Sequence, residues 1–428
     1  MDSVAQPGWV HRQMMPEWQL VSDLMGGTFA MRQAGLRWLP REPAESWAAW
    51  RARLNRTVLF NALSKTVGTL SAKPFQDPLI LSDQAEPVAD MLNNLDGQGN
   101  GLDILARQML SALLQDGMVH VQIDMPRDGG QPYLVVRRAA SLLGASCSSD
   151  GELSQVRFSE TITVRKNSFE EEHREQIRVL TKTGWEVWQQ KSAVSQGWQR
   201  VGSGDYDVGC VPVVTILTEP RGFMYPRPPL MDLAWLNLAH WQSASDQRHI
   251  LHVARVPVLF GRALQVGQND IEIGPNRLIL ADDPAAELKF VEHSGAAIEA
   301  GRQDLIDLED RMAILGLDML SRSTTPVTAT ARQLDTNQSH AALSGVVMQL
   351  ERGLAHILAL LSHILGYGEE GGGQVSFSRN WLQNHVSHDR ARWLLDARRS
   401  DDISRDEFIR EAVKMGLLDS SITPVHKT

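Results

Sequence analysis

Residues 233–255 read LAWLNLAHWQSASDQRHILHVAR, and residues 295–318 read GAAIEAGRQDLIDLEDRMAILGLD. In both stretches apolar residues recur at helical intervals among polar residues that helices tolerate, which predicts two long helices. Pro257 follows the first stretch. Because proline lacks a main-chain N–H, it ends the helix there, and it pushes the preceding residue, Val256, toward extended geometry. The first helix would be about 35 Å long, enough to bridge two ends of a protein.

The segment between these helices, residues 256–294, has a different pattern. It contains VPVLFG and IEIGPNRLIL, and the second places apolar residues on both sides of the turn signal Gly274-Pro275-Asn276. We therefore predict a small β unit that connects the two helices.

The second helix has an apolar side and an acidic side. Its apolar residues form two neighbouring rows: Ile298, Leu305, Met312 and Met319, then Leu308 and Leu315. On the other side four acidic residues outnumber Arg311: Asp304, Asp307, Asp310 and Asp318. Asp304 and Asp307 also match the spacing of a catalytic carboxylate pair, but we interpret this side as a face that looks into water or across an aqueous space.

A run rich in serine, threonine and proline, SRSTTPVTAT, occupies residues 321–330. Its β-branched hydroxyl residues and Pro326 cannot continue the helix, so we predict a loop. Helical spacing returns at residues 331–365 with a broad apolar face: Leu343, Val346, Val347, Leu350, Leu354, Ile357, Leu358 and Leu361. This third helix is predicted to be the best buried of the three.

The rest of the chain predicts an α+β fold. Helical patterns cover residues 44–70 and 101–115, and the second leads into the strand VHVQID. Residues 131–217 predict an antiparallel meander of short strands: YLVV, QVRF, TITV, QIRVL, EVWQQ, GWQRV and VPVVTIL. The charge run FEEEHREQ within it is interpreted as a solvated hairpin or strand edge. After Gly366 a flexible joint precedes a strand, VSFS, and two helices, the second with a capping box at Ser404 and Glu407.

Several long stretches resemble portal proteins of tailed bacteriophages, in the order found in that family. They are MRQAGLRWLPREPAESWAAWRARLNRTVLFNALSKTVGTLSAKPF, LDILARQMLSALLQDGMVHVQID, LAWLNLAHWQSASDQRHILHVARVPVLFG, GAAIEAGRQDLIDLEDRMAILGLDML and TATARQLDTNQSHAALSGVVMQLERGL. The resemblance covers roughly residues 21–365.

The resemblance implies a ring, usually of twelve subunits, at one vertex of a capsid, through which double-stranded DNA is packaged and later ejected. Mapped by order, residues 1–230 correspond to the wing, 231–255 and 295–320 to the two stem helices, 256–294 to the clip, 321–330 to the channel loop, 331–365 to the long wing helix, and 366–428 to the helical crown and C-terminal tail.

The resemblance also implies site residues and partners. The loop expected to touch DNA consists of Ser321, Arg322, Ser323, Thr324, Thr325, Pro326, Val327 and Thr328. The clip residues expected to dock partners are Gln265, Asn269, Asp270, Glu272, Asn276 and Arg277. The expected partners are further copies of the chain, duplex DNA bound without sequence specificity, terminase, head–tail adaptor proteins, and major capsid and scaffolding proteins.

Charge and composition bear on these expectations. A net charge of −9 argues against a protein that grips nucleic acid tightly, because tight binding uses many Lys and Arg contacts to phosphate. A weakly repulsive channel wall suits sliding DNA, although the mild acidity common to soluble proteins explains the same net charge.

Cys147 and Cys210 make neither a disulfide framework nor a metal site, which indicates a reducing compartment. The sequence has no signal-peptide pattern and no apolar run long enough to span a membrane, so we expect the host cytoplasm during assembly and then the virion.

The motifs of common chemistries are missing from the sequence. Without a GxxxxGK[ST] phosphate loop the chain is not expected to hydrolyse ATP, and GxSxG, HExxH and paired CxxC are missing too. We expect no catalytic residue, no cofactor and no metal. Asp246, His249 and His252 leave a hydrolase as a distant alternative. The nearer alternative is a minor structural or scaffold-like capsid component that binds other virion proteins without enclosing DNA.

Overall fold

The computed structural model describes residues 3–126, 129–190, 197–255, 258–262, 285, 287–291, 295–316, 329–378, 388–400, 402–404, 407–409 and 412. The chain has an α+β fold, as predicted, and divides into two compact units. Unit 1 comprises Met1–Ser22, Ser64–Asp232 and Val327–Thr428, and unit 2 comprises Asp23–Leu63 and Leu233–Pro326. The chain passes between the units within α1 (Trp9–Met25), α4 (Ala62–Ala72) and α7 (Met231–Ala254).

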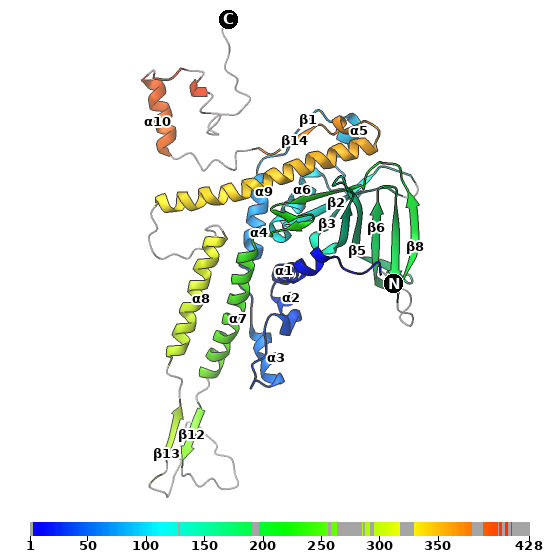
Figure 1. Cartoon of the computed structure of the whole chain (residues 1–428). Helices are drawn as coiled ribbons and strands as arrows, with labels where there is room; N and C mark the ends of the chain where they lie inside the picture. Colours follow the sequence, from blue (N-terminus) through cyan, green and yellow to red (C-terminus); the bar gives the residue numbers. More distant parts are fainter. Residues whose placement is uncertain are drawn as a thin grey trace. The chain divides into compact units, whose positions relative to one another are not determined.

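Unit 1 contains two antiparallel sheets (Figure 1). The three-stranded sheet has the order β3 (Tyr133–Arg138), β2 (Met118–Asp124), β9 (Val213–Leu217). The five-stranded sheet runs in chain order through β4 (Leu142–Cys147), β5 (Leu153–Arg165), β6 (Glu171–Thr181), β7 (Gly184–Gln190) and β8 (Trp198–Asp205). Two short pairs join β1 (Ile80–Ser82) to β14 (Gln374–Ser376), and β10 (Pro220–Gly222) to β11 (Tyr225–Pro226).

The prediction of one meander across residues 131–217 is wrong in its connectivity. The last strand, β9, pairs with β2 instead of continuing from β8. The predicted strands QVRF and TITV are a single strand, β5, and β4 was not predicted. Strand β2 is paired on both of its edges, and almost all of its residues are buried. Local alternation of residues does not encode which distant strand pairs with it.

Unit 1 also contains further helices and short 3₁₀ turns. They are α5 (Glu86–Met91), α6 (Leu102–Asp116), α9 (Ala329–Ile364), α10 (His388–Arg399) and the short 3₁₀ turns Lys73–Phe75, Ala139–Ser141 and Glu369–Gly372. Helix α6 ends at Gly117, whose left-handed backbone (φ 73°) turns the chain directly into β2. Helix α9 packs on α6 and on β9.

The long helix α9 is buried along the face that the sequence predicted. Leu350, Leu354, Leu358 and Leu361 are all fully buried, and their spacing of four, four and three residues places them on one side of the helix. The other four residues of the predicted face are buried as well: Leu343, Val346, Val347 and Ile357. The predicted apolar face of the third helix is therefore confirmed.

The N-terminal helix α1 supplies part of the core of unit 1, although the sequence analysis did not predict it. Trp18 is almost completely buried and packs in one cluster with Met14, Met118 and Phe158. Its indole N–H donates to the main-chain oxygen of Asp116 at 3.1 Å, so the buried polar group of this large side chain is satisfied.

Unit 2 is mostly helical. Besides α7 it contains α2 (Gly27–Ala34), a 3₁₀ turn (Gly35–Arg37), α3 (Trp47–Arg56), β12 (Val258–Arg262), β13 (Glu287–Val291) and α8 (Ala296–Leu315). The two long helices predicted at 233–255 and 295–318 correspond to α7 and α8.

The single helix predicted over residues 44–70 is wrong, because residues 57–61 separate α3 from α4. Thr57 is extended (φ −72°, ψ 135°), and its hydroxyl donates to the main-chain oxygen of Arg53 at 2.9 Å. Its own carbonyl oxygen accepts hydrogen bonds from the guanidinium of Arg32 at 3.1 and 2.8 Å. The N–H of Leu59 donates to the hydroxyl of Thr28 at 3.1 Å. Partners distant in sequence thus replace the helical hydrogen bonds at this point, which a local pattern does not reveal.

Two smaller predictions are confirmed. In the charge run at residues 169–176, Phe169 to Glu175 are exposed and form the end of a turn and the start of β6, whereas Gln176 is buried. In the C-terminal part, the N–H of Ser404 donates to the carboxylate of Glu407 at 2.9 Å, and the N–H of Glu407 donates to the hydroxyl of Ser404 at 3.2 Å, which is the predicted capping box.

Candidate functional site

The candidate site lies on the helical hairpin that α7 and α8 form in unit 2 (Figure 1). Nε2 of His240 lies 3.5 Å from Oε1 of Glu309. The hydroxyl of Ser243 donates to Asp304 at 2.5 Å, and further along Nε2 of Gln247 donates to the main-chain oxygen of Ile298 at 2.8 Å. Residue numbers rise along α7 as they fall along α8, so the two helices pack antiparallel.

A close approach fixes one point of this packing. Gly301 of α8 faces Gln247, and a Cβ atom at position 301 would overlap the side-chain amide of that glutamine. Glycine is helix-weakening in most positions, so its presence here is explained by the space it leaves for the facing helix.

The segment between the two helices begins and ends with paired strands. β12 and β13 are antiparallel, with Val258 opposite Val291 and Arg262 opposite Glu287. They form part of the predicted β unit. The predicted turn at Gly274-Pro275-Asn276 lies outside the described residues.

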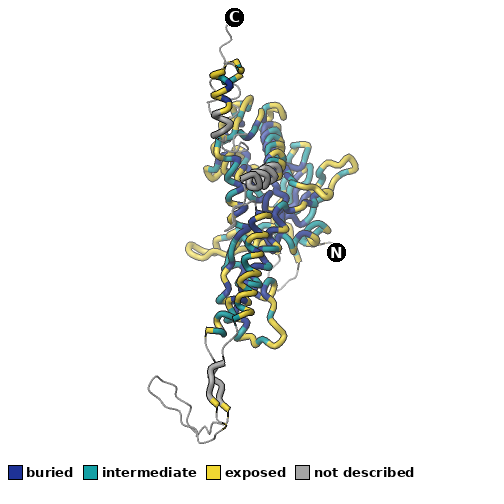
Figure 2. The backbone as a smooth tube through the Cα atoms, turned by 90° about the vertical axis from the view of Figure 1, so that its left-hand side faces the viewer, coloured by how far each residue is buried: buried dark blue, intermediate teal, exposed yellow. Residues whose placement is uncertain are grey.

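The acidic side of α8 is exposed where the structure describes it. Asp304, Asp307 and Asp310 are all exposed, and Asp307 accepts a hydrogen bond from the side chain of Gln303 at 2.7 Å. On the opposite side Leu308 and Met312 are buried. Leu315, seven residues after Leu308 in the predicted row, is 41% exposed and lies in the last turn of the helix. Figure 2 shows buried and exposed segments alternating along this helical part of the chain.

The other sequence-predicted site residues lie outside the described residues. This holds for the whole channel loop, Ser321 to Thr328, and for Asp318. It also holds for the six clip residues Gln265, Asn269, Asp270, Glu272, Asn276 and Arg277. Their assignments stay predictions.

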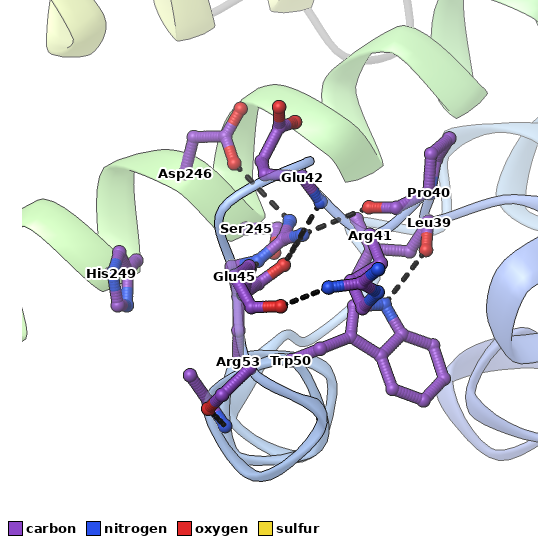
Figure 3. Close-up of polar contacts among 12 residues, drawn as sticks. Leu39, Pro40, Arg41, Glu42, Glu45, Trp50, Arg53, Ser245, Asp246 and His249 are labelled. Atoms are coloured by element: carbon purple, nitrogen blue, oxygen red, sulfur yellow. Dashed lines mark hydrogen bonds and ion pairs between the residues drawn. The ribbon is translucent and has the colours of Figure 1, made fainter.

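An arginine that the sequence analysis did not single out organises the polar contacts beside α7 (Figure 3). The side chain of Arg53 is only 4% exposed. It donates two hydrogen bonds to the carboxylate of Glu45, at 2.9 and 2.8 Å, and one to the main-chain oxygen of Pro40 at 2.9 Å. Toward α7 it reaches Asp246 at 3.3 Å. A planar guanidinium suits such simultaneous contacts, so Arg53 connects α3 to α7.

These contacts change the protonation behaviour of both carboxyl groups. The hydrogen bonds from Arg53 lower the pKa of Glu45 below its ordinary value, against the opposing effect of burial. For Asp246 burial outweighs the attraction of Arg53 and raises the pKa. Nδ1 of His249 lies 3.2 Å from the guanidinium of Arg56. Asp246 and His249 are thus each engaged by an arginine, and among the described residues no group of His, Cys, Asp or Glu side chains is arranged to hold a metal ion.

A groove of about 680 Å³ runs between α7, α8 and the connector that follows α3. Its apolar floor includes Phe60, Leu251 and Leu305. Its charged residues are mainly basic: Arg56, Arg248, His252 and Arg255 line it, against one carboxylate, Glu309. We call this site the basic groove. The sequence signal that could have found it is the spacing of Arg248, His252 and Arg255, which places three basic residues on one side of α7.

Three buried polar atoms in the basic groove have no hydrogen-bond partner among the residues that the structure describes. They are Nε of Arg56, Nδ1 of His240 and Oε1 of Gln247, all within unit 2. Burial lowers the pKa of His240, although Glu309 opposes this effect. Buried polar atoms without partners carry a free-energy cost, so their gathering in one groove marks a surface where a ligand or partner could supply the missing contacts.

Over the described residues, no helix is long and apolar enough to cross a membrane. Within unit 2, the antiparallel hairpin thus carries two surfaces of opposite charge, the exposed acidic side of α8 and the basic groove.

Comparisons with known proteins give one family match and several structural likenesses. A domain of unknown function (DUF4055) matches residues 229–363, which cover α7 to α9. No curated protein matches the sequence. Among solved structures, a chain in "Virion of native gene transfer agent (GTA) particle" is similar at 15% identity and a TM-score of 0.48, over 82% of this chain and 88% of that chain.

Two further solved structures are similar to the same degree. For "Neck of empty GTA particle computed with C6 symmetry" the identity is 14% and the TM-score 0.49, over 82% of this chain and 89% of that chain. For "Neck of native GTA particle computed with C12 symmetry" the values are 15% and 0.48, over 91% and 99%. Similarity at this level carries no conclusion about function.

Proposed function

We propose that this protein is a portal protein: copies assemble into a ring at one capsid vertex, and double-stranded DNA passes through the central channel. The observation that carries the proposal is the antiparallel hairpin of α7 and α8, joined at one end through β12 and β13 and followed by the long helix α9. That order of elements is the one implied by the resemblance of the sequence to portal proteins of tailed bacteriophages.

The charge of the chain supports a conduit more than a clamp. Proteins that hold DNA tightly neutralise phosphates with Lys and Arg, whereas this chain has a net charge of −9. A channel wall without an excess of positive charge lets a duplex slide without binding to it. In the proposed mechanism the stem helices line the passage and the loop Ser321 to Thr328 touches the duplex, with Arg322 as its nearby cation.

The proposed partners follow from the same scheme. Residues 256–294 form the clip, where terminase docks during packaging and head–tail adaptor proteins dock afterwards. The sequence has no phosphate-binding loop, so terminase supplies the energy of packaging by hydrolysing ATP. Major capsid and scaffolding proteins contact the ring from the outside.

The decisive experiment is the mass of the purified protein, with negative-stain images of the same sample. A ring of about twelve copies with a central hole is expected. Since isolated portals can be monomeric before assembly, the sample is also examined after co-expression with its scaffolding and capsid proteins. Compact monomers or dimers in both samples would contradict the proposal and favour a capsid component that binds other proteins without enclosing DNA.

The roles of the loop and the clip are tested separately, with ring assembly as the control. Deleting Ser323 to Pro326 is expected to leave the ring intact and to impair DNA packaging or retention; normal filling of capsids would remove the loop from the mechanism. Reversing the charges of Asp270, Glu272 and Arg277 is expected to weaken the pull-down of terminase or adaptor. An unchanged pull-down would reject the clip assignment.

A further inference from the structure

The basic groove of unit 2 is rich in arginine, whereas the exposed side of α8 carries carboxylates. We propose that the basic groove receives the outer stripe of α8 from a second copy of this chain, where the outer stripe is Gln303, Asp307, Asp310 and Ile314. This inference rests on the proposed ring, and it names the surface through which neighbouring copies meet.

The basic side of this contact is built on α7. Arg248, His252 and Arg255 are spaced by four and three residues, so they lie along one side of the helix, and all three are exposed. Arg248 and Arg255 have no ion-pair partner among the described residues. Leu251 lies between them and gives the stripe an apolar centre.

The acidic side is built on α8. Gln303, Asp307, Asp310 and Ile314 are spaced by four, three and four residues and are exposed, so they too form one stripe. Ile314 is 76% exposed, so it offers an apolar contact at the end of the stripe. A stripe with two carboxylates and one apolar residue complements a groove with arginines and an apolar floor.

The positions of the two surfaces on α8 determine how copies can join. Leu305 and Glu309 face the basic groove, whereas Asp307 and Asp310 lie on the far side of the same helix. At 3.6 residues per turn, these two pairs point in roughly opposite directions. One copy therefore presents its stripe on one side and its groove on the other. Contacts between two different surfaces of identical subunits are heterologous, and they close into rings when the rotation between copies permits.

The polar atoms without partners agree with an occupant that brings carboxylates. Nε of Arg56 is a donor that lies in the basic groove with no acceptor among the described residues. A carboxylate from a second copy would satisfy this donor, and the three arginines of the groove would offset its loss of water.

Charge reversal with restoration tests the proposal in the full-length protein. One variant carries Arg248→Glu and Arg255→Glu, a second carries Asp307→Lys and Asp310→Lys, and a third carries all four substitutions. All four positions are exposed, so circular dichroism is expected to show unchanged folding. The control is Arg51→Glu, an exposed arginine of α3 outside the groove. Sedimentation velocity and native mass spectrometry measure assembly at low and high salt.

Wild type and the control are expected to assemble, and more weakly at high salt because the contact is ionic. Each double variant is expected to need at least about tenfold more protein for the same assembly. A mixture of the two double variants is expected to restore assembly with the variants alternating, because each groove then meets a stripe of opposite charge. The fourfold variant is expected to restore assembly by itself, since its acidic groove meets its own basic stripe.

The outcomes separate this inference from the proposed function. If wild type and both double variants form the same ring, the ring stands and the groove contact is overturned. If the fourfold variant stays as weak as the double variants, the pairing of these two surfaces is rejected. If wild type forms no assembly in any sample, including the co-expressed one, both the ring and the groove contact are overturned.

Discussion

The guanidinium of Arg53 holds the carboxylate of Glu45 through two hydrogen bonds, from Nε at 2.9 Å and from Nη2 at 2.8 Å. The side chains are only 4% and 10% exposed, so the pair is largely removed from water. Because Arg53 also reaches Ser245 and Asp246, it connects two segments of unit 2 that lie almost 200 residues apart in the sequence.

Removing one member of this pair is expected to destabilise unit 2. Glu45→Ala leaves a buried guanidinium without its main partner, and the expected loss is about 3 kcal/mol. Native-state hydrogen exchange of amides in unit 2 measures the change. The control is Arg302→Ala, which breaks the exposed pair with Glu299 and is expected to change the stability by less than about 0.5 kcal/mol. Equal effects of the two substitutions would contradict the role of the buried pair.

Acid is expected to weaken unit 2 through the same carboxyl group. The pKa of Glu45 is lower in the folded protein than its ordinary value of 4.5, so its contribution is fully present above that value and is lost as the pH falls through the lower, folded pKa. The Glu45→Gln variant is expected to show a flatter fall of stability with pH below about 5. Asp246, whose pKa is raised by burial, acts in the opposite direction, so Asp246→Asn is expected to steepen the fall. Parallel curves for wild type and Glu45→Gln would reject this explanation.

Two glycines of α9 offer a matched test of packing. A Cβ atom at Gly353 would overlap Cδ1 and crowd Cγ1 of Ile216 in β9, whereas one at Gly345 would meet nothing. Gly353→Ala is expected to destabilise unit 1 by about 1–3 kcal/mol through overpacking. Gly345→Ala is expected to stabilise the helix by about 0.5–1 kcal/mol, because alanine is the better helix former. Urea unfolding compares the two variants, and a stabilising Gly353→Ala would show that α9 does not approach β9 as described.

The imidazole of His120 is expected to remain neutral in the folded protein at every pH where the protein stays folded. It is fully buried in β2, its Nδ1 lies 2.8 Å from the hydroxyl of Thr215, and burial lowers its pKa to about 3. Since the unfolded chain takes up a proton near pH 6.5, stability falls as the pH drops below that value. NMR of the imidazole carbon and nitrogen shifts follows the protonation, and His120→Leu is expected to reduce the pH dependence of unfolding. Titration of His120 near its ordinary pKa without unfolding would contradict this.

The sequence predicted α7, α8 and α9 with small errors at their ends, because helical amphipathicity is a local property. It failed at residues 57–61, where Arg32 and Thr28 supply partners for the main chain from outside the segment. It also failed at β9, whose partner β2 lies almost a hundred residues earlier.

The same distinction applies to the candidate site. The acidic residues Asp304, Asp307 and Asp310 were found because they share one face of a single helix. Arg53 and the basic groove were missed because their residues come from α3, α7 and α8, and nothing in any one of these segments indicates the others.

By itself, then, the sequence determined the order of the elements, the paired long helices with a β unit between them, and the buried face of α9, since each depends on residues three or four positions apart. Only the tertiary structure decided which strands pair, that residues 23–63 join the helical hairpin in one compact unit, and that a groove rich in arginine lies opposite an acidic stripe. These features arise from contacts between segments far apart in the chain, whose free energies depend on packing and on hydrogen-bond partners that no local pattern specifies.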